Sequence, residues 1–303
     1  MIEVKEVHSK KIDKLRTREE KISKKFPLDG NMDKVNWKRI RKVVDVSAKL
    51  LKVPRGVKIY VYKKNGLKFE VVTPKKQTNN DVIIYFHGGG FVLGNAVYTR
   101  HFTKDLSCTS GSIVISVDYP LGPDNKINDI IDNVSAVYDL VSIQYPNSNI
   151  SLIGTSAGGC IALALALKIN KEKKKPLHSL VLYSPLTDLS ESYKSMNEIN
   201  DGVIFNTCKK GCRKVILGKY KKKDMYASPL LYVRNNIPKT LICADNNETL
   251  FTDSYVLYNK CLENNVETKF IIYKNTYHAF QTIASKTKET KELLEITCDF
   301  IKG

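Results

Sequence analysis

A serine flanked by glycines, between two apolar segments, constrains this chain more than any other feature. The motif Gly154-Thr155-Ser156-Ala157-Gly158 follows the apolar run 150–153 and opens a second apolar segment at 160–167. This order predicts a strand, a tight turn and a helix, and the strained turn needs small neighbours because it lies close to both elements. Such a turn lifts a hydroxyl above the edge of a sheet, so Ser156 is a candidate nucleophile. The alternative interpretation is that Ser156 only caps the helix beginning at Ala157.

A glycine-rich loop upstream offers donors for the negative charge that acyl transfer creates. Residues 81–86 read as a buried strand and end in His87-Gly88-Gly89-Gly90. Acyl transfer passes through a tetrahedral oxyanion, which preorganised N–H groups must stabilise. We expect the amides of Gly88 and Gly89 to supply two such groups, and that of Ala157, at the positive end of its helix dipole, to supply a third. A flexible turn is the alternative interpretation of these glycines.

A serine nucleophile needs a base, and elimination among the five histidines leaves His278. It follows the predicted strand 268–273 and precedes the final helix, where a base can project over the carboxyl edge of a sheet. A polar loop residue is the alternative interpretation. The other histidines lie in a charged N-terminal stretch, in the glycine loop, in a predicted helix and just before a predicted strand: His8, His87, His101 and His178.

Three carboxylates compete to orient this histidine. The loop after the predicted strand 240–244 contains Asp245, Glu248 and Asp253. We expect Asp253 to cap or begin the helix 254–263, which leaves the other two as candidates. The chain order of nucleophile, acid and base is the one expected for an α/β-hydrolase.

Taken together, these motifs resemble the hormone-sensitive-lipase-like branch of the α/β-hydrolases, a family of microbial carboxylesterases and acetyl esterases. The resemblance extends from about residue 65 to the C-terminus. It rests on 87–90, on 154–159 and on the block from Glu248 to His278. Further landmarks of the family match the segments 117–124, 183–188 and 227–230.

The resemblance favours Glu248 over Asp245 as the acid of the triad, because Glu248-Thr249-Leu250 fills the place where many members have Asp-Pro-Leu. The sequence departs from the family pattern at two positions. Thr155 replaces a common aspartate, as in one subgroup of the family, and Pro120 replaces an expected arginine.

The resemblance implies hydrolysis of short to medium acyl esters through an acyl-enzyme, with no metal or organic cofactor. An amidase, a deacetylase or an arylformamidase would use the same triad. A non-catalytic small-molecule receptor can be built on the same scaffold, although such receptors usually lose the histidine that His278 supplies here.

Alternating strands and helices indicate an α/β fold, with a mostly parallel central sheet covered by helices on both faces and a helical lid. We expect a catalytic core over 56–188 and 226–303, an N-terminal helical part of the lid over 1–55, and a lid insertion over 189–225. The first lid segment has apolar residues spaced through a basic background: Trp37, Ile40, Val43, Val44, Val46 and Leu50. Strands are predicted at 58–62, 68–72, 81–86, 112–117, 150–153, 179–183, 240–244 and 268–273.

Charge adds little about partners beyond a small-molecule ester. The formal net charge is +18, but the lysine clusters at 171–175, 209–214 and 219–223 read as exposed surface without interleaved aromatics or a phosphate-binding loop. We therefore expect no nucleic-acid partner. The sequence does not decide between a monomer and a homodimer, in which 268–273 would be an edge strand that pairs between copies.

Cysteine usage and hydropathy bear on location. Seven cysteines, an odd and scattered set, favour reduced thiols and a cytoplasmic protein. The close pair Cys208 and Cys212 lacks the further ligands of a zinc site. We expect neither a membrane span nor a secretory signal, because the chain has no apolar run of the length that a span requires and begins with mixed charge.

Overall fold

The computed structural model describes residues 1–25, 28–48, 52–193 and 202–303, and this part of the chain contains one nine-stranded sheet. Its strand order is β1-β9-β8-β7-β6-β4-β5-β3-β2. The strands are β1 (Ile2–Glu6), β2 (Val57–Lys64), β3 (Leu67–Pro74), β4 (Val82–Phe86), β5 (Ile113–Val117), β6 (Ile150–Thr155), β7 (Ser179–Tyr183), β8 (Lys239–Asp245) and β9 (Thr268–Lys274).

The sheet is parallel from β1 through β5 in this order, and only the pairs β5–β3 and β3–β2 are antiparallel, so β3 alone runs against the other strands. The hairpin turns at Asn65 and Gly66, whose φ angles of 53° and 75° suit a two-residue turn. Strands β4 to β7 are buried along their whole length, as their runs of β-branched and aliphatic residues require in a parallel sheet covered on both faces. The predicted α/β-hydrolase architecture and all eight predicted strands are confirmed.

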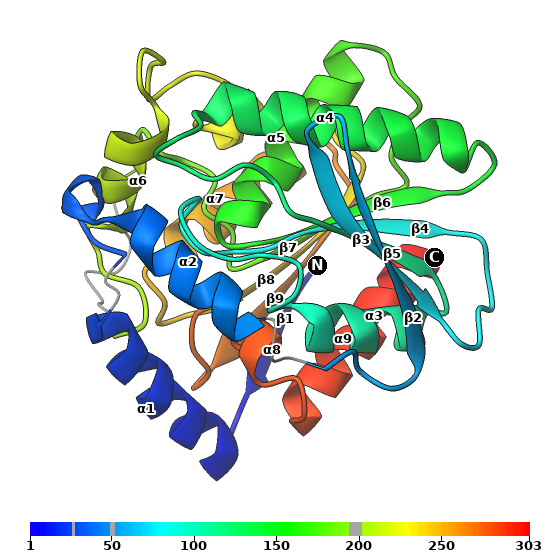
Figure 1. Ribbon diagram of the computed structural model, residues 1–303, viewed down its shortest axis with the longest axis horizontal. Coiled ribbons are helices and arrows are strands. Elements are labelled where there is room, and N and C mark those ends of the chain that lie inside the picture. The colour runs from blue at the N-terminus through cyan, green and yellow to red at the C-terminus, as the bar shows by residue number, and fades with distance from the viewer. Residues whose placement is uncertain (26–27, 49–51, 194–201) are drawn as a thin grey trace.

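Helices cover both faces of this sheet (Figure 1). The helices α4 and α5 pack against each other on one face, and α3 and α9 pack against each other on the opposite face. The helices are α1 (Lys10–Lys25), α2 (Trp37–Ala48), α3 (Arg100–Ser110), α4 (Ile127–Gln144), α5 (Ala157–Lys171), α6 (Cys208–Ile216), α7 (Phe251–Glu263), α8 (Phe280–Ile283) and α9 (Lys288–Lys302), with 3₁₀ turns η1 (Met32–Lys34) and η2 (Pro229–Tyr232).

Two segments far apart in the sequence, 28–34 and 207–214, pack tightly together at one end of the sheet, where α6 lies beside α2 in Figure 1. The Thr207 hydroxyl accepts a hydrogen bond of 2.9 Å from the Gly30 amide. A Cβ atom at Gly211 would lie only 1.8 Å from the carbonyl oxygen of Asp29. Glycine is therefore required where α6 meets this loop.

The N-terminal segment departs from the expected purely helical structure of residues 1–55. Its first residues form β1, which pairs in parallel with β9 and places Ile2 opposite Phe270. A five-residue strand with alternating burial is too short for its period to stand out in a basic sequence. The expectation that 268–273 is an edge strand is therefore wrong, because β9 lies between β1 and β8. Leu50 and part of the expected insertion 189–225 lie outside the described residues.

Candidate active site

Ser156 occupies a strained turn between β6 and α5. Its φ and ψ angles are 55° and −118°, and its amide donates a 2.9 Å hydrogen bond to the carbonyl of Tyr183. A Cβ atom at Gly154 would lie 2.2 Å from the Gly158 carbonyl oxygen, and one at Gly158 would lie 2.2 Å from that of Phe86. The side chain of Ser156 makes no capping hydrogen bond to α5. Helix capping therefore does not explain this serine.

The glycine loop after β4 lies against this turn. A Cβ atom at Gly88 would come within 3.3 Å of the Cβ atom of Ser156. Gly89 has a φ of 111°, and a Cβ atom there would lie 2.2 Å from the carbonyl oxygen of Leu93. Within the described ranges, we find no hydrogen bond donated by the amides of Gly88, Gly89 or Ala157. Three main-chain donors thus remain available beside the serine.

His87 stabilises the glycine loop through its ring and its main chain. Its ring stacks on Tyr119 at 4.3 Å between ring centroids, and its Nδ1 donates to the Gly88 carbonyl at 2.7 Å. The Tyr119 hydroxyl donates to the His87 carbonyl at 2.7 Å. Burial lowers the pKa of His87, which keeps the ring neutral despite its hydrogen bond to Gly88 and the charge of Asp118.

The structure brings His278 and Glu248 together. The Nδ1 atom of His278 lies 3.5 Å from Oε2 of Glu248, and the two residues are only 4% and 1% exposed. The histidine is presented by the turn after β9, and the glutamate by the loop after β8. An imidazole whose Nδ1 faces a carboxylate has its Nε2 available to accept a proton.

Ser184 joins the two loops, and sequence reasoning did not single it out. Its hydroxyl donates to Oε2 of Glu248 at 2.7 Å and accepts from the Ala279 amide at 3.2 Å. Its φ of 45° is the strained, left-handed conformation that also occurs at Ala279. The only signal was its place in the segment 183–188, a landmark of the resembling family.

Asp245, the alternative acid, has other partners. Its Oδ2 accepts from both the amide and the hydroxyl of Thr276 at 2.7 Å, and its Oδ1 accepts from the Asn247 amide at 2.9 Å. Asp245 therefore ties together the two loops that carry Glu248 and His278. This geometry favours Glu248 as the residue that orients the imidazole.

Asp253 lies in the first turn of α7, which begins earlier than expected, and its carboxylate serves another element. Oδ2 accepts from the amides of Thr187 and Asp188 at 2.7 and 3.0 Å, and Oδ1 forms an ion pair with Lys209 of α6. The Lys209 side chain is only 14% exposed. The expectation that the cluster 209–214 is plain surface is therefore wrong for Lys209, whose charge is held by a buried carboxylate.

A cavity of about 480 Å³ lies over the serine at the carboxyl edge of the sheet. We call its lower part the floor. It comprises the lining residues Tyr85, His87, Gly88, Gly89, Leu93, Gly94, Thr155, Ser156, His278 and Ala279, and we count with them Glu248 and Ser184, which support the His278 loop. The roof is formed by α1, η1, α2, α6 and residues 203–204. The roof residues that line the cavity are Glu19, Ile22, Ser23, Leu28, Ile40, Val44, Val203 and Ile204.

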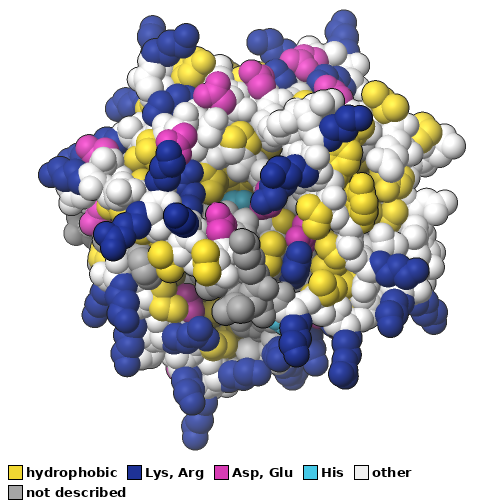
Figure 2. Space-filling view, viewed as in Figure 1, with side chains coloured by type: hydrophobic (Ala, Val, Ile, Leu, Met, Phe, Trp, Pro, Cys, Tyr) yellow, Lys and Arg dark blue, Asp and Glu magenta, His cyan; other side chains and the backbone are white. Residues whose placement is uncertain are grey.

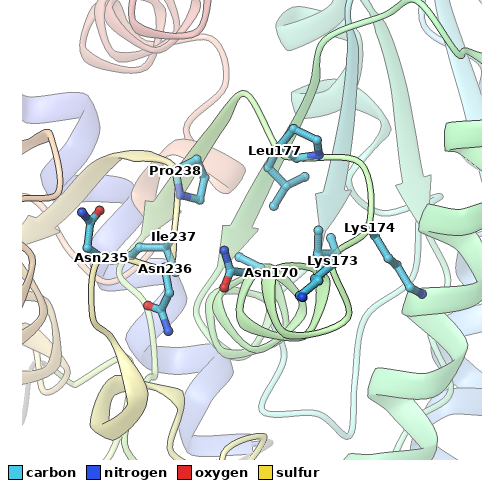
Figure 3. Close-up of a pocket in the computed structure, with 11 residues that line it drawn as sticks. Asn170, Lys173, Lys174, Leu177, Asn235, Asn236, Ile237 and Pro238 are labelled. Atoms are coloured by element: carbon cyan, nitrogen blue, oxygen red, sulfur yellow. The ribbon is translucent and has the colours of Figure 1, made fainter.

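A second cavity, of about 440 Å³, lies at the opposite edge of the sheet. Figure 3 shows it between the end of α5, with Asn170 and Lys173, and the segment 235–238 that leads into β8. Its lining contains no serine, histidine or carboxylate.

Within the described residues, no group of three His, Cys, Asp or Glu side chains could hold a metal ion. None of the described helices is long and apolar enough to cross a bilayer.

Comparisons with known proteins agree with the fold described above. A family model described as alpha/beta hydrolase fold matches residues 83–282. The chain is 27% identical over 265 residues to an "Esterase" of Acinetobacter venetianus, covering 86% of this chain and 87% of the relative. It is 28% identical over 232 residues to "Esterase LipU" of Mycobacterium tuberculosis, covering 73% and 77%.

Solved structures share the fold at lower identity. The crystal structure of an esterase/lipase from an uncultured bacterium aligns with a TM-score of 0.82 at 22% identity, covering 97% of this chain and 98% of that one. An esterase from the bacterial hormone-sensitive lipase (HSL) family aligns with a TM-score of 0.82 at 20% identity, with the same coverage.

Proposed function

Because this chain belongs to the α/β-hydrolase fold family and is a carboxylic ester hydrolase, we propose that it cleaves short to medium acyl esters through an acyl-enzyme on Ser156. The resemblance drawn from the sequence motifs is confirmed at the level of this family. The observation that carries the proposal is that a single cavity is lined by Ser156, His278, Gly88 and Gly89.

In the proposed acylation step, Ser156 Oγ attacks the ester carbonyl while His278 takes its proton. Glu248 faces His278 Nδ1 and stabilises the imidazolium that forms. The amides of Gly88, Gly89 and Ala157 receive the oxyanion, and the positive end of the α5 dipole favours the same charge. His278 then gives the proton to the leaving alcohol.

Deacylation reverses these roles. Water attacks the acyl-enzyme, His278 accepts the proton of the water, and the carboxylic acid leaves as Ser156 regains its proton.

We further propose that the segments 1–55, apart from β1, and 189–225 form the lid over this site. The acyl chain then lies between floor and roof, against apolar side chains such as Ile22, Ile40 and Ile204. A volume of about 480 Å³ suits a small ligand.

The proposal is tested by replacing the nucleophile. Ser156→Ala should abolish hydrolysis of p-nitrophenyl butyrate and labelling by a fluorophosphonate probe, while circular dichroism shows an intact fold. Ser142→Ala, on α4 away from the cavity, is the matched control and should keep both signals. Unchanged turnover in Ser156→Ala would exclude the mechanism. A panel of esters of increasing acyl length, beside aryl amides, defines the leaving group and the chain length.

A further inference from the structure

The catalytic cavity has a charge opposite to that of the chain as a whole. The chain carries a formal net charge of +18, and lysines and arginines are spread over the face that Figure 2 shows. Among the described residues that line the cavity, however, there is no lysine or arginine, and Glu19 is the only carboxylate. No described lining cation therefore repels a cationic ligand from the space over Ser156.

Glu19 is the carboxylate that α1 contributes to the cavity lining. Its side chain is half-buried, and in the part of the chain that the structure describes it forms no hydrogen bond or ion pair. Burial raises the pKa of Glu19, and the charge of the preceding Arg18, which does not line the cavity, opposes this only partly. A carboxylate that is partly removed from water and has no charged partner is stabilised most by a ligand that brings a cation next to it.

The rest of the described cavity lining suits an alkylammonium group. Ile22, Leu28 and Ile283 offer apolar contacts, and Tyr98 is an aromatic ring on the same lining. Aliphatic and aromatic surfaces accommodate the methyl or methylene groups of an ammonium ion, and ring faces attract its charge. A neutral ligand of the same shape would cover Glu19 without compensating its charge.

We propose that Glu19 is a specificity residue that selects esters carrying an ammonium group over neutral esters of the same shape. This inference rests on the proposed ester hydrolysis at Ser156. The ammonium group can belong to the alcohol or to the acyl part of the ester, and the test separates the two.

The experiment compares kcat/KM for two matched substrate pairs. Butyrylcholine against 3,3-dimethylbutyl butyrate places the charge on the alcohol, and p-nitrophenyl 6-aminohexanoate against p-nitrophenyl heptanoate places it on the acyl chain. In Glu19→Gln, the ratio of cationic to neutral kcat/KM should fall about five- to tenfold for one pair. Glu19→Lys should lower the same ratio further, because it adds repulsion.

Glu20→Gln is the matched control, because it removes the same charge from the next residue of α1, which does not line the cavity. It should leave both ratios within twofold of the wild type. If Glu19→Gln leaves both ratios unchanged, or if Glu20→Gln changes them equally, the inference is overturned.

A binding measurement separates failure of this inference from failure of the proposed function. If no ester is hydrolysed and the fluorophosphonate does not label Ser156, the proposed function fails. Calorimetric titration with hexyltrimethylammonium and with hexanol then still tests Glu19. The Kd of the ammonium should rise at least fivefold in Glu19→Gln relative to that of the alcohol, and equal changes would contradict the assignment.

Discussion

The floor and the roof of the catalytic cavity are held in place by different kinds of contact. The floor depends on the backbone, with positive φ angles at Ser156, Ser184 and Ala279 and with glycines whose Cβ atoms would collide with main-chain oxygens. The roof has one such glycine, Gly211 beside the Asp29 carbonyl, and otherwise depends on side chains, such as the ion pair of Lys209 with Asp253 and the hydrogen bond from Trp37 Nε1 to the Met32 carbonyl.

This difference indicates that the floor determines the catalytic geometry and that the roof determines substrate selectivity. A main-chain turn keeps its shape whatever neighbouring side chains do, so it can hold a nucleophile and oxyanion donors in a fixed geometry. A roof assembled from side chains can exchange one lining group, such as Glu19, without moving the floor. Substitutions in the floor should therefore change kcat, and those in the roof should change stability, KM and selectivity.

The largest expected effect concerns the acid of the floor. Glu248→Gln should lower kcat for p-nitrophenyl butyrate about 10³- to 10⁴-fold, because an amide cannot hold the imidazole in the required tautomer. Asp245→Asn should lower kcat much less and lower the melting temperature instead, because its carboxylate ties Thr276 to Asn247. A larger loss of kcat in Asp245→Asn would reverse the assignment of the acid.

A change at the anchor of the roof should act mainly on stability. Lys209→Met leaves Asp253 buried without its cation, which should lower the free energy of unfolding by about 3 kcal/mol in urea titrations. The KM should rise more than kcat falls, because α6 helps to position the roof. Lys210→Met, at the next and exposed position of the same helix, is the control. Equal effects of the two variants would show that the pair does not anchor the roof.

Ser184 tests whether the floor needs more than the proposed triad of Ser156, His278 and Glu248. Ser184→Ala removes the hydroxyl that joins Glu248 to the Ala279 amide, and we expect a loss of about tenfold in kcat with an unchanged KM. Ser184→Gly removes the same hydroxyl but relaxes the φ of 45°. Both variants should lose activity equally. Recovery in Ser184→Gly would mean that backbone strain, rather than the hydrogen bond, causes the loss.

The sequence predicts the floor better than the roof for a physical reason. The turn at Ser156 and the loop at Gly88 are local, so their glycines and apolar flanks lie within a few residues and leave a readable pattern. Ser184 forms hydrogen bonds with Glu248 and Ala279, which are 64 and 95 residues away, and a local sequence pattern cannot predict such contacts. Lys209 looks like one more surface lysine until α7 brings Asp253 beside it.

The helices of the roof and the first strand show the same limit. The apolar residues of α2 divide between Trp37, which is buried, and Val43 and Val46, which are exposed. At about 100° per residue these side chains lie on different sides of the helix, so the apolar spacing alone does not tell which side is packed. The strand β1 carries only alternating apolar and charged residues over five positions. Its place beside β9 depends on pairing with the far end of the chain, which a local pattern cannot supply.

The smallest expected effect comes from His87, the floor histidine that the proposed mechanism does not use. Its lowered pKa means that the unfolded chain binds a proton below pH about 6.5 more readily than the fold does. The stability that a neutral His87 contributes is thus fully present above that pH and is lost as the pH falls toward the folded-state pKa. Acidification from about pH 7.5 to about pH 5 should lower the melting temperature about 2 °C more in the wild type than in His87→Gln. His101→Gln, which removes an exposed histidine of α3, should follow the wild type, and identical pH dependence in all three proteins would mean that the ring under the glycine loop does not resist protonation.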